Sequence, residues 1–487
     1  MKSIKVNAVL NTMKTVCNII FPIITVPYVT RVLGAANYGK VSYSNSIVSY
    51  FALFAALGIA NYAQREGPRI RDDQKAINQF ASEVFTINFI STIISYICLA
   101  ILLIFSTKLR NYQLLILIQS SSILLTTLGT DWVNSVYEDY LYITVRYLIF
   151  QIIAILSLFI FVKNPSDYVI YASISVFASA GENVLNMFFV RRYVKIRFAP
   201  LRGCKKHIVP TLKLFAIAVT TVIYVSSDIT ILGIFRGDKE VGIYTVSSKI
   251  YSTFKTVLSA IMMVSIPRLA FYLGHQKYKE YNALIKQIFN YFVTFLLPTI
   301  CGLFMLSRQI MVLMSGPEYA SGTVSLQILS ISLFCSMFAT LFAAGILLTY
   351  KRDNVYLVAT VISSIVNIVL NFILIPYMGM NGAALTTLLA EFLMMVITAH
   401  YSLKIEEIAK QKKEIFATSN VIISSIIGAF GIVIECLLVR RFITNLVLQI
   451  MGSFIIGVLV YCIILTIFKN PILEYVLKSL KQKLKRS

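Results

Sequence analysis

The stretch 80–106, FASEVFTINFISTIISYICLAILLIFS, carries a single charged residue, Glu83. A helix that crosses the hydrocarbon core of a bilayer needs about 20 mostly apolar residues. This stretch exceeds that length, and it lacks the strict alternation of polar and apolar residues that a half-buried strand would show. It therefore predicts a membrane-spanning α-helix.

Runs of the same kind recur along the whole chain. The 487 residues are 58% hydrophobic and 13% charged, whereas soluble domains are about 45–50% apolar and about 25% charged. Gly, Pro, Asn and charged residues separate the runs, as turns require. We expect an all-α integral membrane protein with about 14 transmembrane helices. The expected spans are 7–33, 41–61, 80–106, 112–134, 142–162, 168–190, 208–234, 241–266, 288–306, 323–349, 355–375, 381–401, 419–439 and 443–468.

The net charge of +23 has a topological explanation. Cytoplasmic loops of membrane proteins carry the excess of Lys and Arg. If the N-terminus is inside, the inside segments hold 29 basic residues and the outside segments hold 10. The asymmetry predicts that both termini are cytoplasmic. It also explains the basic balance without nucleic acid as a partner.

Two distant parts of the chain repeat one pattern. The segment 14–34 matches 213–233, because each begins with Lys and ends with Leu-Gly at the same spacing. After a four-residue insertion in the second copy, 39–47 matches 242–250, with Gly, Ser and Ile in register. Six spans separate the copies, so both have the same orientation. This indicates a parallel repeat about an axis along the membrane normal.

The repeat predicts the domain organisation. We expect an N-terminal lobe of six spans at 1–190, a basic cytoplasmic linker at 191–207 and a C-terminal lobe of six spans at 208–402. Residues 403–468 add two spans without a counterpart. The basic tail 469–487 is expected to lie on the anionic inner leaflet.

Polar stripes on three spans indicate a hydrated cavity. At 100° per residue, the polar residues of each stripe fall on one helix face, and lipid would not tolerate such a face. We therefore expect the three helices to line a shared cavity between the lobes. The stripes are Asn7, Asn11, Lys14, Asn18 and Thr25; Lys213, Thr220, Tyr224 and Asp228; and Tyr244, Ser248, Tyr251 and Lys255.

Ionisable side chains inside spans are costly and are candidates for function. Lys255 and Glu391 lie deepest, so neither easily reaches an interface. For Lys14, Lys213 and Arg146, near the cytoplasmic edge, snorkelling of the side chain to the interface is an alternative. Arg31 lies at an outer helix end, where a flanking charge is equally plausible. The candidate substrate-binding residues are Lys14, Arg31, Arg146, Lys213, Tyr224, Lys249 and Lys255, and the candidates for ion coupling or charge pairing are Asp228 and Glu391.

Signatures of enzymes are lacking in the sequence. The Gly-rich basic stretch 233–239 lacks P-loop spacing, no HExxH is present, and the three His are isolated in sequence. We therefore expect no cofactor, no metal and no catalytic residues. The expected external loops are short, which disfavours a membrane glycosyltransferase or polymerase.

Several stretches together resemble the polysaccharide-repeat flippases of the Wzx type. They are PYVTRVLG at 27–34, TDW at 130–132, DITILG at 228–233, VGIY at 241–244 and NIVLNFILIP at 367–376, followed by Gly379 and Glu391. The resemblance covers most of the chain. The family belongs to the multidrug/oligosaccharidyl-lipid/polysaccharide exporter superfamily, which also holds the lipid II flippase and the MATE drug exporters. The family often has Phe after Asp-Trp, where this chain has Val133.

The resemblance implies a membrane transporter with two six-helix lobes that works by alternating access in the bacterial cytoplasmic membrane. Its substrate would be an undecaprenyl-diphosphate-linked oligosaccharide, and a polysaccharide polymerase and a chain-length regulator would be partners. The lysines and Arg146 would bind diphosphate or acidic sugars. Capsule, O-antigen-like and other repeats fit these residues equally, as do proton, sodium or membrane-potential coupling.

Two alternatives come from other classes. A MATE-like exporter of small cations should have an acidic cavity, whereas the ionisable residues in these spans are mostly basic. A scaffold for a polysaccharide assembly complex would have no reason to keep polar stripes on three helices.

Overall fold

The computed structural model describes residues 4–416 and 418–474, with side chains except those of 4–9, 11, 217, 220, 221, 223–225 and 413. Within this part of the chain the regular structure is helical throughout, without a strand, which confirms the all-α class. The expected tail 469–487 lies outside the described residues from 475 onward. The chain divides into two compact units, Met1–Gly242 and Ile243–Ser487.

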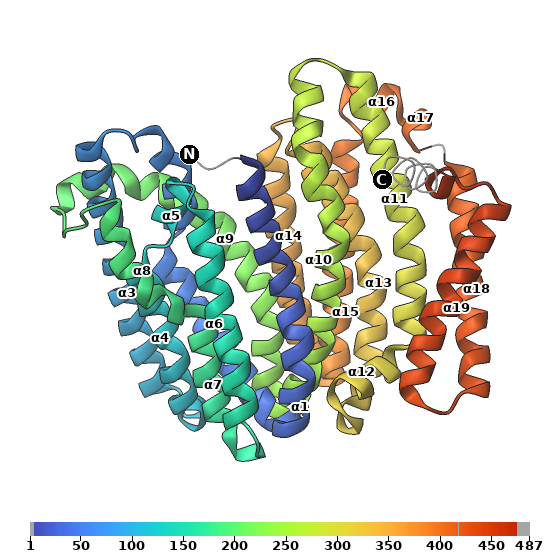
Figure 1. Cartoon of the computed structure of the whole chain (residues 1–487), viewed down its shortest axis with the longest axis horizontal. Helices are drawn as coiled ribbons and strands as arrows, with labels where there is room; N and C mark the ends of the chain where they lie inside the picture. Colours follow the sequence, from blue (N-terminus) through green and yellow to red (C-terminus); the bar gives the residue numbers. More distant parts are fainter. Residues whose placement is uncertain (1–3, 417, 475–487) are drawn as a thin grey trace. The chain divides into compact units, whose positions relative to one another are not determined.

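Figure 1 labels the helices. Those that begin in the first unit are α1 Ile4–Ala56, α2 Ile59–Glu66, η1 Gly67–Arg69, α3 Gln74–Phe105, η2 Lys108–Tyr112, α4 Gln113–Gly129, α5 Trp132–Val136, α6 Tyr140–Phe161, η3 Pro165–Asp167, α7 Tyr168–Val176, η4 Phe177–Gly181, α8 Glu182–Phe189, η5 Val190–Arg192, α9 Leu201–Phe235 and α10 Asp238–Gly274. The others are α11 Tyr278–Met305, α12 Ser307–Ser315, η6 Pro317–Gly322, α13 Thr323–Thr340, η7 Leu341–Leu347, α14 Asp353–Met378, α15 Met380–Ser402, α16 Glu406–Lys410, α17 Lys412–Phe416, α18 Ser419–Phe442 and α19 Leu446–Ile467.

Every expected span falls mainly on helix, but the breaks between spans differ from the expected turns. The span 7–33 and residues 41–56 of the next span form the single long element α1, with non-helical φ and ψ at Gly34 (φ 72°, ψ 169°). The rest of the span 41–61 passes through a turn at Leu57 and Gly58 into α2. Gly adopts a positive φ without a Cβ clash. One residue therefore redirects the chain where the sequence predicted a seven-residue turn.

Eleven segments of the described chain are long and apolar enough to cross a membrane. One of them, Thr12–Arg69, covers most of the expected span 7–33 and all of 41–61. The expected span 168–190 is a continuous helical segment made of α7, the π-helical turn η4, α8 and the first residue of η5. The expected span 208–234 lies within the single helix α9, Leu201–Phe235. Fourteen spans therefore remain compatible with the structure.

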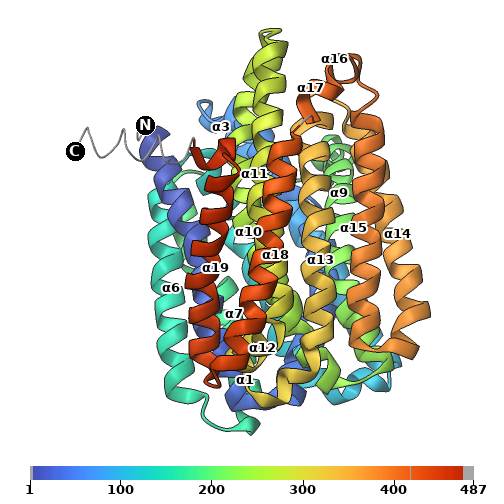
Figure 2. The same cartoon turned by 90° about the vertical axis from the view of Figure 1, so that its right-hand side faces the viewer.

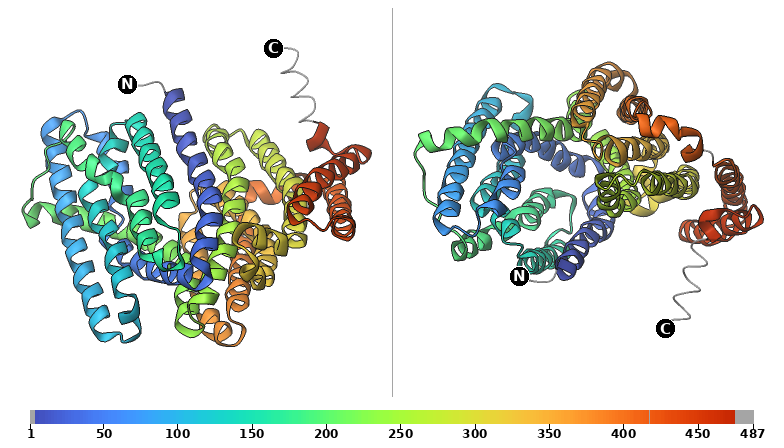
Figure 3. Two further views of the ribbon diagram at one scale, coloured as in Figure 1. Left: turned by 60° about the horizontal axis from the view of Figure 1, so that its bottom comes forward. Right: turned by 90° about the horizontal axis from the view of Figure 1, so that it is seen from above.

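In the first unit, α1 is the central element. It packs against α3, α4, α6 and α9, while α4 also packs against α7 and α8. Figure 3 shows these helices from two further directions. Because α9 contacts α1, α2 and α3, it groups with this unit. The lobes 1–190 and 208–402, which follow from the repeat, remain a prediction.

In the second unit, α13 packs against α15 and α11, and α14 packs against α15. The hairpin of α18 and α19 contacts α11 and α12, and Figure 2 shows the two helices side by side. Tyr461 of α19 anchors the hairpin, because its hydroxyl donates a hydrogen bond to the carbonyl of Thr294 (2.6 Å). The appended hairpin is therefore firmly packed in its unit.

A reciprocal backbone contact joins the two repeated segments within the first unit. A Cβ on Gly39 would overlap the carbonyl oxygen of Asp238, and a Cβ on Gly242 would overlap that of Ala35. The repeat pairs Gly39 with Gly242, and the same offset pairs Ala35 with Asp238. In each copy the glycine therefore packs against the backbone carbonyl of the equivalent position in the other copy. Two segments related by a local two-fold axis are expected to make such a contact.

We expect Gly39→Ala or Gly242→Ala to destabilise the protein by about 3 kcal/mol or more, because a methyl group cannot fit between the two backbones. Thermal unfolding of the purified protein in detergent measures the effect. Gly302→Ala is the control, since a Cβ there meets nothing within 4 Å. Unchanged melting of both variants would contradict the close contact.

Candidate functional site

An ion pair inside the second unit unites two of the predicted residues. The Lys255 ammonium on α10 donates to Oε1 of Glu391 on α15 at 2.7 Å, and the Tyr251 hydroxyl donates to the same oxygen at 3.2 Å. Glu391 is 6% exposed, whereas the side chain of Lys255 is 34% exposed. The carboxylate is therefore buried and neutralised, while part of the lysine side chain remains exposed.

Helical periodicity explains how these side chains meet. Tyr244, Tyr251 and Lys255 lie on one face of α10, and Tyr244 pairs with Thr387 on α15 at 3.4 Å. Thr387 and Glu391 are one turn apart on α15, so they form a matching face. The polar stripe predicted for this span thus partly serves contact with α15. Lys249 lies off this face and is exposed.

A second charged cluster lies in the first unit. The Arg146 guanidinium on α6 donates to Glu182 on α8 (3.1 Å) and to Asp131 beside α5 (2.5 Å). Arg146 is 3% exposed, and Tyr142 covers it at 5.1 Å. Removing one partner from a buried ion pair is strongly destabilising. This cluster therefore fastens α6 to its neighbours, and Arg146 is not an open cation in this conformation.

The polar face of α1 lines a small cavity of about 210 Å³ in the first unit. Asn18 and Thr25 of the predicted stripe are among its walls, together with Tyr147 and Gln151 of α6. The Tyr147 hydroxyl donates to Asn18, and the Lys14 ammonium lies 5.2 Å from the Tyr147 ring. The predicted stripe on this span therefore faces α6.

The other predicted residues are more dispersed. Arg31 and Lys213 are exposed, and Asp228 is buried. The side chain of Tyr224 lies outside the described residues. The structure thus unites Lys255 with Glu391 and places Lys14 beside the ring of Tyr147. The shared cavity between the lobes, and the substrate-binding role of these residues, remain predictions.

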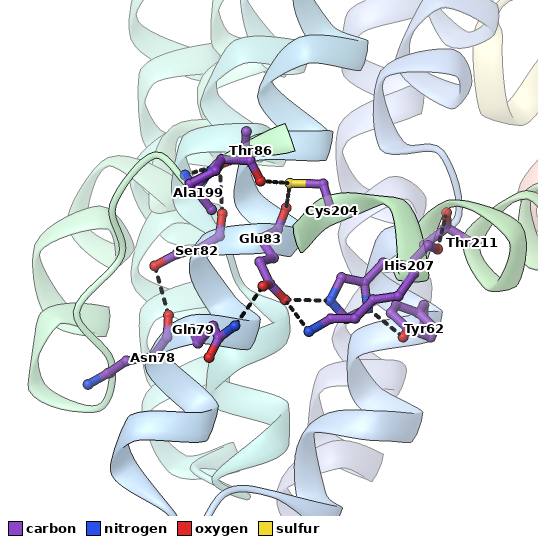
Figure 4. A network of polar contacts seen from close by, with 12 residues as sticks. Tyr62, Asn78, Gln79, Ser82, Glu83, Thr86, Ala199, Cys204, His207 and Thr211 are labelled. Atoms are coloured by element: carbon purple, nitrogen blue, oxygen red, sulfur yellow. Dashed lines mark hydrogen bonds and ion pairs between the residues drawn. The ribbon is translucent and has the colours of Figure 1, made fainter. Parts of the chain in front are cut away.

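Sequence reasoning missed a polar network around Glu83, which Figure 4 shows. The carboxylate of Glu83 on α3 is 3% exposed and contacts His207 (2.8 Å) and Lys206 (2.9 Å) on α9. Gln79 donates to its other oxygen, and Tyr62 bonds His207 Nδ1 at 2.8 Å. His207 is isolated in sequence but not in space. Glu83 is the single charged residue in the apolar run 80–106, and this was the feature of the sequence that could have indicated the network.

The linker between the expected lobes is held along α3. Asn78 and Thr86 accept hydrogen bonds from the backbone N–H groups of Lys195 and Ala199, and Ser82 accepts one from Arg197. The acceptors recur every four residues on the helix, and the donors recur every second residue on an extended segment. We call the segment 193–200 the strap.

The strap is also fixed at its start. The Tyr193 hydroxyl donates to Asp139 (2.8 Å), and the ring stacks on Tyr137 at 4.5 Å. Burial and this hydrogen bond to a carboxylate raise the pKa of Tyr193 to about 12. The predicted linker is therefore an ordered part of the first unit.

A long apolar groove lies in the second unit. Its volume is about 590 Å³, and its walls come from α11, α18 and α19. Phe295, Pro298, Ile432, Phe454 and Val458 are among the lining residues. Such a surface suits a hydrocarbon chain.

Removal of the three acceptors should release the strap. In Asn78→Ala/Ser82→Ala/Thr86→Ala, each lost hydrogen bond costs about 1 kcal/mol, so tryptic cleavage after Lys195 and Arg197 should accelerate at least about tenfold. Ser121→Ala/Ser173→Ala is the matched control, because these hydroxyls bond only within their own helices. Equal cleavage rates would mean that the ladder does not hold the strap.

Neutralising Arg146 should destabilise the first unit. Arg146→Gln leaves Asp131 and Glu182 without their cation, at a cost of about 3–5 kcal/mol. Adding Glu182→Gln should recover part of that loss. Thermal unfolding in detergent measures both. A fully stable Arg146→Gln that fails in transport would instead favour the predicted substrate role.

Comparisons with known proteins agree with this architecture. The family model described as "Polysaccharide biosynthesis protein" matches residues 4–272, more than half of the chain, and the MatE model matches 214–373. Two relatives carry the name "Putative O-antigen transporter". The one from Shigella dysenteriae is 23% identical over 78% of this chain and 95% of its own length, and the one from Escherichia coli K12 is 21% identical over 77% and 91%.

A solved structure has the same fold. It is the inward closed conformation of the lipid II flippase MurJ, with a TM-score of 0.71 and 17% identity over 96% of this chain and 99% of that chain. The stretches that resembled Wzx-type flippases lie largely in the region matched by the family model. The chain therefore belongs to the polysaccharide biosynthesis protein family, among the Wzx-type members of the multidrug/oligosaccharidyl-lipid/polysaccharide exporter superfamily.

Proposed function

We propose that this protein is a flippase that moves an undecaprenyl-diphosphate-linked oligosaccharide repeat from the cytoplasmic to the outer leaflet of the bacterial cytoplasmic membrane by alternating access. The observation that carries the proposal is the Lys255–Glu391 pair. It holds, deep in a span, a lysine whose side chain is partly exposed. The names of the relatives and the fold support the general activity.

The chemistry of the pair suits a lipid diphosphate. An ammonium has three donor hydrogens, and Glu391 accepts one of them. A phosphate oxygen could accept from another of these donors, while Glu391 keeps the lysine neutralised when substrate is absent. Binding and release would therefore exchange one anionic partner for another without leaving a bare charge in the membrane.

The apolar groove supports the lipid part of the substrate. A polyprenyl chain needs a continuous hydrocarbon surface, and the groove along α11, α18 and α19 offers one of about 590 Å³. Arg31, Lys14, Lys213, Lys249 and Tyr224 are further candidates for headgroup or sugar contacts, and Asp228 is a second candidate for charge pairing. A polymerase and a chain-length regulator would act on the product.

The test is the fate of lipid-linked oligosaccharide in a deletion strain. We expect completed repeats to accumulate on the inner leaflet while surface polysaccharide is lost, and we expect the intact gene to reverse both effects. Normal polysaccharide with altered drug sensitivity would instead favour MATE-like export of small cations, to which the match of the MatE model at 214–373 gives some support.

Removing both charges of the pair separates binding from folding. Lys255→Met/Glu391→Gln leaves no unpaired charge, so the protein should fold and melt near the wild-type temperature. Export should nevertheless fall at least about tenfold, because one charge-assisted hydrogen bond to phosphate contributes about 1.5–3 kcal/mol. Lys279→Gln, a change at an exposed lysine on α11, is the matched control. Full export by the folded double variant would overturn the role of the pair.

A further inference from the structure

The buried carboxylates of the described helices include Glu182 on α8, Glu391 on α15 and Glu435 on α18, besides Glu83 on α3 and Asp228 on α9. Glu182 is bonded to Arg146, and Glu391 to Lys255. Glu435 on α18 is 5% exposed, yet neither of its carboxyl oxygens has a hydrogen-bond partner among the described residues. Glu435 therefore differs in kind from Glu182 and Glu391.

The surroundings of Glu435 are apolar or neutral. Ser453 on α19 and Cys436 on α18 are its polar neighbours, and the Ser453 hydroxyl is itself buried without a partner among the described residues. Oε2 lies against Gly457, whose built Cβ would be 3.5 Å away. Ser453 and Gly457 are one turn apart on α19. The carboxyl thus packs against the face of α19 that carries Ser453 and Gly457.

No cation in the neighbouring packing is available to Glu435 within the described part of the unit. Arg440, on the same helix, donates to the carbonyl of Met305 and to Gln309 (2.8 Å). The other titratable groups near Glu435 and Tyr461 are Cys436, Cys462 and Cys301, none of which carries positive charge. The remaining cations of α11, α12 and α18 are Lys279, Arg308 and Arg441, which are exposed, and Lys286, which is half-buried. The Tyr461 hydroxyl is bonded to Thr294.

An ionised carboxylate in such a place would be bare in a medium that cannot solvate it, whereas a carboxylic acid is neutral and can donate to Ser453. We propose that Glu435 is a proton-binding site. It holds a proton while the α18–α19 hairpin is closed, and it releases the proton only when the hairpin admits water. In the expected topology α18 runs outward, so the site lies nearer the outer face.

The site adjoins the apolar groove, because Cys436, Ser453 and Gly457 all line that groove. An occupant of the groove would therefore touch the residues that enclose the carboxyl. Proton binding itself does not depend on what the protein transports. It can be tested without a transport assay, so its failure would leave the proposed function untouched.

The probe is dicyclohexylcarbodiimide, which adds to protonated carboxyls in apolar surroundings and leaves a stable acylurea. The purified full chain in detergent is treated near neutral pH and digested for mass spectrometry. We expect Glu435 to be labelled at least about fivefold more than Glu182 and Glu391, which are paired, and we expect labelling to fall as pH rises. Glu435→Gln removes the label.

A positive control comes from the same chain. In Lys255→Met, Glu391 loses its cation and should become reactive, which shows that the probe reaches buried carboxyls. Failure to label Glu435 in that sample would overturn the proposal. Protection by sodium at constant pH would also overturn it, in favour of a metal-cation site.

Thermal unfolding provides a second measurement, which distinguishes a neutral Glu435 from an ionised and paired one. Glu435→Gln replaces a neutral acid by a neutral amide of the same shape, so its melting temperature should match the wild type. Glu182→Gln removes a charge that Arg146 needs and should melt lower. A large loss of stability in Glu435→Gln would indicate an ionised, paired carboxylate and contradict the proposal.

Discussion

Hydrocarbon offers no hydrogen-bond partner, and this constraint governs the protein at every scale. Backbone groups must be satisfied within each span, which leaves the helix as the regular element for the described chain. Hydroxyls follow the same rule, as when Thr30 and Thr86 donate to carbonyls one turn earlier in their helices. Charges inside the spans obey it by pairing, as Arg146 does with Glu182 and Lys255 with Glu391.

The pairs divide into two kinds with different consequences. Around Arg146 all three charges are held by close contacts, and the guanidinium is covered by an aromatic ring. Around Lys255 the carboxylate is buried but the lysine side chain is partly exposed. A closed pair stabilises one packing of helices. An open pair also leaves an attractive site for an anion, and its neutral ground state limits the cost of keeping a charge in the membrane.

Much of the fold could be predicted because length and hydropathy are properties of single segments. The break at Gly34 could not be predicted, because the local sequence does not distinguish a change of direction at one residue from a turn of several residues. Lys255 and Glu391 were recognised as candidates from their depth, but they are 136 residues apart in sequence, and their pairing depends on how α10 meets α15. The same holds for Glu83 and His207, and for the strap, whose order comes from acceptors on a distant helix.

The contact between Gly39 and Gly242 has an evolutionary consequence. A contact that each copy makes with its equivalent is the geometry of an isologous interface, which identical subunits form when they dimerise. A chain whose duplicated segments keep that geometry behaves as a dimer fused end to end. Fusion lets the sequences of the two copies diverge elsewhere. A lysine that attracts an anion can therefore arise in one copy and not in the other. At Gly39 and Gly242 the sequences cannot diverge, because a side chain on either glycine would overlap the backbone of the other copy.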